Sequence, residues 1–241
     1  MKKGFALLFI LLILLFIIAA AAGLYLYFKK SKNSATSVSQ TSCTFNLAPQ
    51  LASSELLDKM QGHQNYQLEV NMKLTSSEIN WTILRAGNKY TLNSKDIPDI
   101  IDYLDCDDVK NYSLIKSSNK YADLTNEDSS ILSSGVGRPE YYFKSWPSNI
   151  TTKGTDTLEG QKVRVYTAAA NNLEHEAYVS AETGLPVKIV TKTTKDAVIN
   201  LKFTRLNEVS ESEVTIPTSA KGYTKEEMKQ GEQIINRITK P

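Results

Sequence analysis

The chain of 241 residues carries 28 basic and 26 acidic side chains, and 41% of its residues are hydrophobic. Five of the lysines flank one apolar run near the N-terminus, so the remainder holds 23 basic against 26 acidic residues. This weakly acidic remainder gives no electrostatic case for nucleic-acid binding, which depends on clustered Lys and Arg. The roughly 200 residues beyond the apolar run suffice for one domain with its own core.

An uncharged apolar run covers residues 5–28, after a tail of residues 1–4. As a helix the run is about 36 Å long, which exceeds the ~30 Å hydrocarbon core of a bilayer. A helix also satisfies its own backbone polar groups, as lipid requires. The run therefore predicts a transmembrane helix that serves as an uncleaved signal anchor. The alternative is a cleaved signal peptide, because Lys2 and Lys3 form a basic n-region and residues 19–22 are small.

The positive charges on the two sides of this run are nearly balanced. Lys2 and Lys3 precede it, while Lys29, Lys30 and Lys32 follow it. The signal-anchor layout favours a cytoplasmic N-terminus, a single pass through the cell membrane and an exported remainder. Residues 29–43 are rich in Ser and Thr, which predicts a flexible linker. Residues 44–241 are then the extracytoplasmic domain.

Cys43 and Cys106 are the two cysteines of the chain. In an exported domain an isolated pair of this kind predicts one disulfide. The disulfide would close a loop of about 63 residues and stabilise the fold by ~4 kcal/mol on the chain-entropy model. In a cytosolic domain two unrelated thiols would be the better interpretation.

Helices are predicted near both ends of the domain and once between them. Residues 49–61 place Pro49 in a first turn, apolar residues largely on one face and Gly62 at the stop. A short helix is predicted at residues 98–104. A C-terminal helix is predicted from about residue 225, because Thr224 and Glu227 have the spacing of a capping box.

Alternating apolar and polar residues predict strands in the rest of the domain. The clearest is YQLEVNMKLT at residues 66–75, where every second residue is apolar up to Leu74. Sequential strands joined by tight turns, with helices before and after them, indicate an α+β fold with a meandering antiparallel sheet. The other predicted strands cover residues 79–83, 89–93, 112–116, 120–124, 161–167, 174–180, 186–193 and 198–206.

Catalytic and metal sites find little support in the sequence. The two histidines are His63 and His175, and the residues after His175 lack the second histidine of a metalloprotease motif. The position of His175 on a strand between two glutamates favours a surface residue. Asp105 and Asp107 fit the first two ligand positions of an EF-hand loop, positions 1 and 3, but Val109 stands at position 5. We therefore expect no enzyme, no cofactor and no metal.

Three segments of the second half resemble the LolA/LppX-like superfamily, which contains the Lol-type lipoprotein carriers and the LppX/LprG lipid-binding lipoproteins. The segments are residues 154–167 (GTDTLEGQKVRVYT), 176–193 (EAYVSAETGLPVKIVTKT) and 201–217. Ala181 departs from the superfamily pattern, where an Asp is expected. The residues that match it are Tyr178, Val179, Thr183, Gly184, Leu185 and Pro186.

The resemblance implies an open, strongly curved antiparallel half-barrel, closed by helices, whose concave apolar face takes acyl chains. One departure concerns attachment, because no cysteine adjoins the apolar run and Cys43 lies 15 residues beyond Phe28. A tethered domain cannot ferry cargo as a free carrier does. The resemblance therefore supports the fold more than shuttling.

An aromatic cluster at residues 141–146 adds a candidate site, although such clusters more often fill a core. In a half-barrel the inward side chains of the first strands would line an apolar cavity, with this cluster near its mouth. The predicted ligand-binding residues are Leu68, Val70, Met72, Trp81, Ile83, Tyr141, Tyr142, Phe143 and Trp146.

The leading functional hypothesis is a membrane-anchored extracytoplasmic protein that binds a lipid or a lipoprotein acyl chain. One alternative is a structural or interaction module of the cell envelope without a ligand. Another is a pilin-like subunit, suggested by the sequence KKGF at residues 2–5. Against the pilin, Phe9 stands where bacterial prepilins carry a glutamate.

Overall fold

The computed structural model describes residues 55–227, except residues 75, 126–131, 145, 148, 171–172, 193–196 and 225–226. The chain divides into two units, one of residues 1–40 with 224–241 and one of residues 41–223. The predicted tail, transmembrane helix and linker lie outside the described residues, as does Cys43. Within the described part, no helix is both long and apolar enough to cross a membrane.

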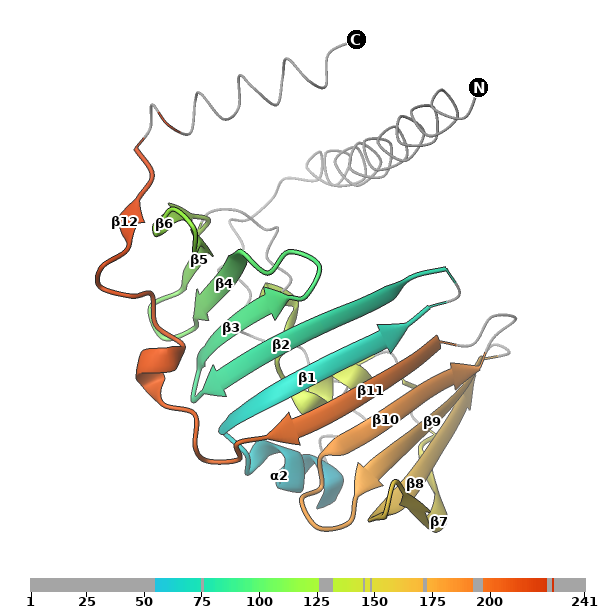
Figure 1. Ribbon diagram of the computed structural model, residues 1–241. Coiled ribbons are helices and arrows are strands. Elements are labelled where there is room, and N and C mark those ends of the chain that lie inside the picture. Colours follow the sequence, from blue (N-terminus) through green and yellow to red (C-terminus); the bar gives the residue numbers. More distant parts are fainter. Residues whose placement is uncertain are drawn as a thin grey trace, which may run out of the picture. The chain divides into compact units, whose positions relative to one another are not determined.

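A twelve-stranded sheet dominates the second unit (Figure 1). Its strands are β1 (Asn65–Lys73), β2 (Glu78–Ala86), β3 (Lys89–Ser94), β4 (Ile100–Asp105), β5 (Lys110–Ile115), β6 (Lys120–Asp123), β7 (Thr151–Leu158), β8 (Gln161–Ala170), β9 (Leu173–Ser180), β10 (Pro186–Lys192), β11 (Ala197–Thr204) and β12 (Lys221–Gly222).

The sheet consists of two meanders that meet at β1 and β11. Its order is β12-β6-β5-β4-β3-β2-β1-β11-β10-β9-β8-β7. The β1–β11 pair is antiparallel and runs in register from Gln67↔Thr204 to Lys73↔Val198. Only β12, which pairs with β6, is parallel to its neighbour within the described sheet. Hairpin connections explain this order, because antiparallel strands need only a tight turn between them.

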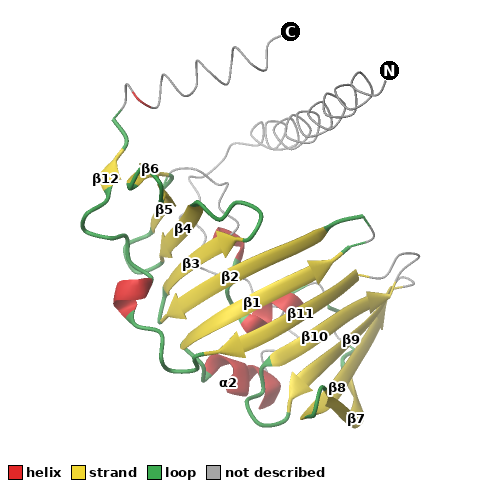
Figure 2. Cartoon of the chain, in the orientation of Figure 1, coloured by secondary structure: helices red, strands yellow, loops and turns green. Residues whose placement is uncertain are grey.

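Helices are few in the described part (Figure 2). They are α2 (Glu55–Gln61) and the 3₁₀ helices η1 (Leu132–Ser134), η2 (Pro139–Phe143) and η3 (Glu211–Glu213). Helix α2 confirms the end of the first predicted helix, and the Gly62 amide donates to the Asp58 carbonyl where it stops. The capping box is confirmed too, since Thr224 and Glu227 exchange backbone and side-chain hydrogen bonds. The rest of the predicted C-terminal helix is almost entirely outside the described residues.

The fold class is confirmed as a curved, mostly antiparallel sheet with few helices (Figure 1). All nine predicted strands are present, but the helix predicted at residues 98–104 is wrong. Residues Ile100–Asp105 form β4, paired with β3 and β5. The Asn93 amide helps to build the preceding turn, because it donates to the carbonyls of Pro98 and Ile100 at 3.2 and 2.6 Å.

Strand β7 was not predicted from the sequence. Its residues TTKGTDTL are exposed from the first to the seventh, with Leu158 half-buried. An edge strand with two wet faces has no reason to alternate apolar and polar residues. The periodicity that reveals the other strands is therefore missing here.

One face of the sheet, here named the inner face, is apolar and buried. Tyr66, Leu68 and Val70 of β1 are at most 2% exposed. The register places Leu68 opposite Ile83 and Val70 opposite Trp81, so these side chains share that face. Residues 132–146, here named the cover, pack on it through η2 and its neighbours. The cover is yellow in Figure 1 and lies behind β1 and β11; the opposite face is here named the outer face.

Candidate functional site

The inner face brings together most of the residues predicted to bind a ligand. Trp81 and Tyr141 pack against the hydrophobic core from its margin, and both are half-buried. Met72, also half-buried, is not part of that core cluster among the described residues. The members inside the cluster are Leu68, Val70, Ile83, Tyr142, Phe143 and Trp146.

Aromatic side chains of the cover lie directly on the inner face. The rings of Phe143 and Trp146 are 5.0 Å apart, and Trp146 stacks on His175 of β9 at 5.3 Å. Phe143 is fully buried and Trp146 is 3% exposed. Each such side chain contributes ~1.5–3 kcal/mol through the apolar area it removes from water.

His175 is a core residue, which corrects the interpretation of a surface histidine. It is 7% exposed, and its Nδ1 lies 3.1 Å from the Thr191 hydroxyl on β10. Burial lowers the pKa of His175, because the charged imidazolium loses its hydration. The neighbouring glutamates misled the sequence interpretation, since successive residues of a strand point to opposite faces.

A polar cluster closes one end of the inner face, and the sequence analysis missed it. Arg85 is 3% exposed and its Nη1 donates to the Tyr66 hydroxyl at 3.2 Å. The guanidinium carbon also lies 5.5 Å from the ring centres of both Tyr66 and Tyr90. Burial raises the pKa of Tyr66 above its usual value and keeps the hydroxyl protonated. The sequence did contain one clue, because Arg85 lies two residues after Ile83 and therefore on the same face of β2.

Hydrogen bonds tie this polar cluster to the cover. The Tyr66 hydroxyl donates to the Gly137 carbonyl at 2.7 Å, and Arg138 Nε donates to the Tyr90 hydroxyl at 3.0 Å. Position 137 must be glycine in this arrangement, because a Cβ there would lie 2.8 Å from the Tyr90 ring. The cover therefore sits close to the sheet at this end.

Glu140 of η2 is an exception to the apolar character of the cover. It is 2% exposed, and its Oε2 has no hydrogen-bond partner in the described structure. A buried oxygen of this kind costs about 1–3 kcal/mol relative to a satisfied one. Burial opposes the rise in the pKa of Arg85, to which Tyr66 and Tyr90 contribute most and Glu140 adds. This cost works against the closed packing of the cover.

A groove of about 500 Å³ crosses β2, β1, β11 and β10. Two predicted residues, Val70 and Trp81, are among its lining. Val70 is only 2% exposed and contributes little accessible surface to the groove. Polar residues of the alternate phase, Asn71, Asn80 and Asn200, belong to its lining as well.

The asparagines in the lining of this groove form a row. Asn71 Nδ2 donates to Asn80 Oδ1 at 2.8 Å, and Asn200 Nδ2 donates to Asn71 Oδ1 at 3.2 Å. The three residues stand opposite one another on β2, β1 and β11. Lys188 of β10 continues the row beside Asn200 and lies 5.7 Å from the Tyr178 ring centre. The outer face is thus polar along the strands whose inner face is apolar.

Metal chemistry has no assembled ligand set in the part of the chain that is described. There, no group of three or more His, Cys, Asp or Glu side chains could hold a metal ion. Cys106 follows β4 and packs partly buried against the core, whereas its predicted partner Cys43 lies outside the described residues. The Cys43–Cys106 disulfide thus stays a prediction.

No protein-family model and no curated protein matches the sequence. Solved structures do match, among them an uncharacterized conserved protein from Thermus thermophilus, with a TM-score of 0.43 and 10% identity over 71% of this chain and 98% of that chain. The MucA/MucB complex of Pseudomonas aeruginosa matches with a TM-score of 0.42 and 13% identity over 70% of this chain. That match covers 62% of the other chain, so this chain spans less than two thirds of it.

The lipoprotein LppX of Mycobacterium tuberculosis also matches, with a TM-score of 0.39 and 11% identity over 69% of this chain and 98% of that chain. The similar structures thus include LppX, in agreement with the resemblance predicted from the sequence. All three TM-scores lie below 0.5, so these likenesses assign neither a family nor a ligand to this chain.

Proposed function

We propose that this protein is a membrane-anchored, extracytoplasmic binding protein without enzymatic activity, whose curved sheet takes an acyl chain of a lipid or lipoprotein. The observation that carries the proposal is the inner face. It is a continuous apolar surface over several strands, and the cover on it is built from short 3₁₀ helices. A surface of this kind suits a long apolar ligand that lies along it.

An acyl chain gains ~0.8 kcal/mol for each methylene that leaves water. In the proposed complex the chain lies along β1 and β11 and displaces Phe143 and Trp146 from the inner face. The polar contacts of the cover described above lie at the end with Tyr66 and Tyr90. The part with Phe143 and Trp146 meets the sheet through apolar and stacking contacts, which an acyl chain replaces in kind.

The membrane anchor and the export of the domain rest on the sequence. Residues 5–28 have the length and composition of a transmembrane helix, and the exported side permits a Cys43–Cys106 disulfide. No free cysteine occurs among the residues that the structure describes. Protease added to intact cells should digest the chain beyond residue 32. Alkylation before and after reduction should differ by two labelled thiols, and a protected domain with two reactive thiols would reverse both proposals.

Photocrosslinking in lipid nanodiscs tests the acyl-chain proposal. The full chain is reconstituted with a lipid that carries a photoreactive group at the end of its acyl chain, and crosslinked peptides are mapped by mass spectrometry. We expect crosslinks on β1, β11 and the cover. Val70→Trp should abolish them, because the indole fills the inner face where the chain would lie.

Val190→Trp is the matched control. Val190 is half-buried and stands opposite Val198, in the alternate phase from Ile189, so its side chain belongs to the outer face. This variant should retain the crosslinks. Melting curves check that both variants fold, since overfilling a packed core at Val70 costs ~1–3 kcal/mol. Wild-type protein with crosslinks confined to residues 5–28 would refute the proposal.

The second candidate is a structural or interaction module of the cell envelope without a ligand. The close approach of Gly137 to Tyr90 and Ile83 favours it, because cover and sheet leave no room between them at that point. The same crosslinking experiment separates the two candidates. Absence of crosslinks on the inner face, in a protein that melts cooperatively, would decide for the module.

A further inference from the structure

A second cavity lies away from the acyl-chain site, beside strands β3 to β6. Its volume is about 310 Å³. Its lining combines tyrosines, paired charges and an apolar wall at residues 214–216. We name it the tyrosine groove after Tyr103, Tyr112 and Tyr121, which come from three neighbouring strands.

The tyrosines form an aromatic surface across these strands. Tyr103 of β4 stands directly opposite Tyr112 of β5, and the rings of Tyr112 and Tyr121 meet edge to face at 5.3 Å. Their hydroxyls make no hydrogen bond to another side chain or backbone group of the described residues. Burial raises the pKa of Tyr103 and of Tyr112, so both hydroxyls stay protonated. Tyr103 is only 7% exposed, so the ring faces and hydroxyls that a ligand can reach are those of the half-buried Tyr112 and Tyr121.

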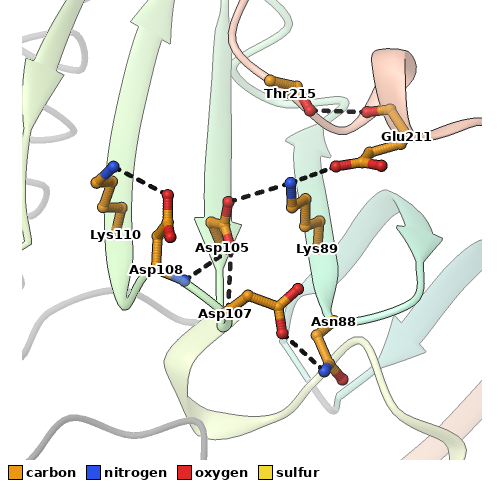
Figure 3. A network of polar contacts seen from close by, with 8 residues as sticks. All are labelled: Asn88, Lys89, Asp105, Asp107, Asp108, Lys110, Glu211 and Thr215. Carbon is orange, nitrogen blue, oxygen red and sulfur yellow. Dashed lines mark hydrogen bonds and ion pairs between the residues drawn. The ribbon is translucent and has the colours of Figure 1, made fainter.

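Charged side chains form the rim of the groove as ion pairs (Figure 3). Lys89 lies between Asp105, at 3.4 Å, and Glu211, while Lys110 Nζ lies 3.0 Å from Asp108. The Asp105 carboxylate also accepts the backbone amide of Asp108 at 3.1 Å. Three carboxylates, those of Asp105, Asp108 and Glu211, face two lysines in this network, so the rim carries one net negative charge.

The apolar wall is held in place by the same network. Residues 214–216 follow η3, and the Thr215 hydroxyl donates to the Glu211 carbonyl at 2.8 Å. Glu211 in turn pairs with Lys89 of β3 (Figure 3). A segment from the end of the domain is thereby fixed against its first meander. The groove is preformed, which spares a ligand the cost of ordering it.

We propose that the tyrosine groove binds a neutral saccharide. Sugar rings present apolar C–H faces that pack on tyrosine rings, and their edges carry hydroxyls that match carboxylate acceptors and ammonium donors. The excess negative charge of the rim disfavours an anionic ligand. The volume lies at the lower end of the ~300–1,000 Å³ of ligand pockets and suits a mono- or disaccharide. An acyl chain would leave the charged rim without compensation.

A proline-rich peptide is the main competing occupant, because such peptides also dock on aromatic grooves. The residues favour the saccharide for two reasons. The wall at residues 214–216 bounds the groove on one side, and the carboxylates of Asp105 and Asp108 accept hydrogen bonds that a proline-rich chain has few donors to make. This inference does not depend on the proposed acyl-chain function.

Calorimetric titration of the full chain in nanodiscs tests the inference. The probes are the neutral disaccharide N,N′-diacetylchitobiose, a disaccharide that contains a uronic acid, and a polyproline peptide. We expect binding of the neutral disaccharide. Tyr112→Ala should weaken it about tenfold, the loss typical of a central aromatic contact. Tyr178→Ala, which removes a tyrosine of β9 outside the groove, should leave it unchanged.

Asp108→Asn is a second variant. It should fold like the wild type, because the Asp108 side chain is 61% exposed. It should weaken disaccharide binding about threefold, because it loses a charged acceptor. Equal losses in Tyr112→Ala and Tyr178→Ala would overturn the inference. So would tighter binding of the uronic acid probe, binding of polyproline alone, or no binding of any probe.

Discussion

The inner and outer faces of the sheet are built from the same strands but serve different purposes. On β1, the side chains of Tyr66, Leu68 and Val70 are buried, whereas Gln67 and Glu69 between them remain partly exposed. The inner face is held by apolar contact with the cover. The outer face carries hydrogen-bonded rows and the tyrosine groove. The difference teaches that one alternating sequence supplies both the stability of the domain and its accessible polar surface.

The first prediction compares leucines on the two faces of neighbouring strands. Leu68→Ala should lower the free energy of unfolding by about 2–5 kcal/mol, because Leu68 is fully buried in the core and a cavity would remain. Leu84→Ala, on the outer face of β2 opposite Gln67, should cost about 1 kcal/mol or less. Urea unfolding followed by circular dichroism measures both. Equal losses in the free energy of unfolding would show that the two faces contribute equally to stability.

The second prediction compares two arginines. Arg85→Lys should destabilise the domain by about 1–3 kcal/mol, because an ammonium cannot serve the Tyr66 hydroxyl and the Gly87 and His63 carbonyls in one plane. Arg205→Lys should cost less than about 1 kcal/mol, since its ion pair with Glu213 is solvated. Thermal unfolding of both variants checks the order. A larger loss of stability in Arg205→Lys than in Arg85→Lys would show that the polar cluster around Arg85 does not hold the cover to the sheet.

The third and smallest prediction concerns acid. The pKa of His175 is lowered by burial in the folded state, so the unfolded chain binds the proton more readily. The stability that comes from the neutral form is therefore present above the usual histidine pKa of 6.5 and declines as the pH falls below it. Between about pH 7.5 and pH 5.5 the domain should lose about 1 kcal/mol or less.

His175→Gln should remove this part of the pH dependence and leave the rest. Trp146 stacks on His175, so its fluorescence during urea unfolding at several pH values reports the effect. If the free energy of unfolding depends on pH in the variant as it does in the wild type, the acid sensitivity belongs to other groups. It would also weaken the distinction between a desolvated inner face and a solvated outer one.

The strands of the sheet were largely predictable, because a half-buried strand imprints a period of two on its sequence. Residues 66–75 show this most clearly, and they form β1. The same rule failed where a strand is not simply buried on one face and exposed on the other. Residues Ile100–Asp105 carry apolar side chains at a spacing compatible with a helix, yet pairing with β3 and β5 made them a strand. Propensity yields to tertiary pairing in such short segments.

The candidate sites were predictable only in part. The alternation of β1 and β2 correctly grouped Leu68, Val70 and Ile83 on one buried face. The cluster at residues 141–146 was expected near the mouth of a cavity, but nothing in the local pattern indicated that Phe143 and Trp146 would be buried over that face. Nor did it indicate that residues 214–216 would wall a groove lined by Tyr112. These contacts join segments far apart in the chain.

By itself, then, the sequence determined the meandering strands, the apolar inner face and the turns, because each depends on neighbours within a few residues. The tertiary structure alone decided how the two meanders join through β1 and β11, where the cover rests, and which tyrosines and charges meet on the outer face. The reason is physical. Local periodicity shows which face of a strand is buried, whereas long-range packing decides which segment of the chain buries it.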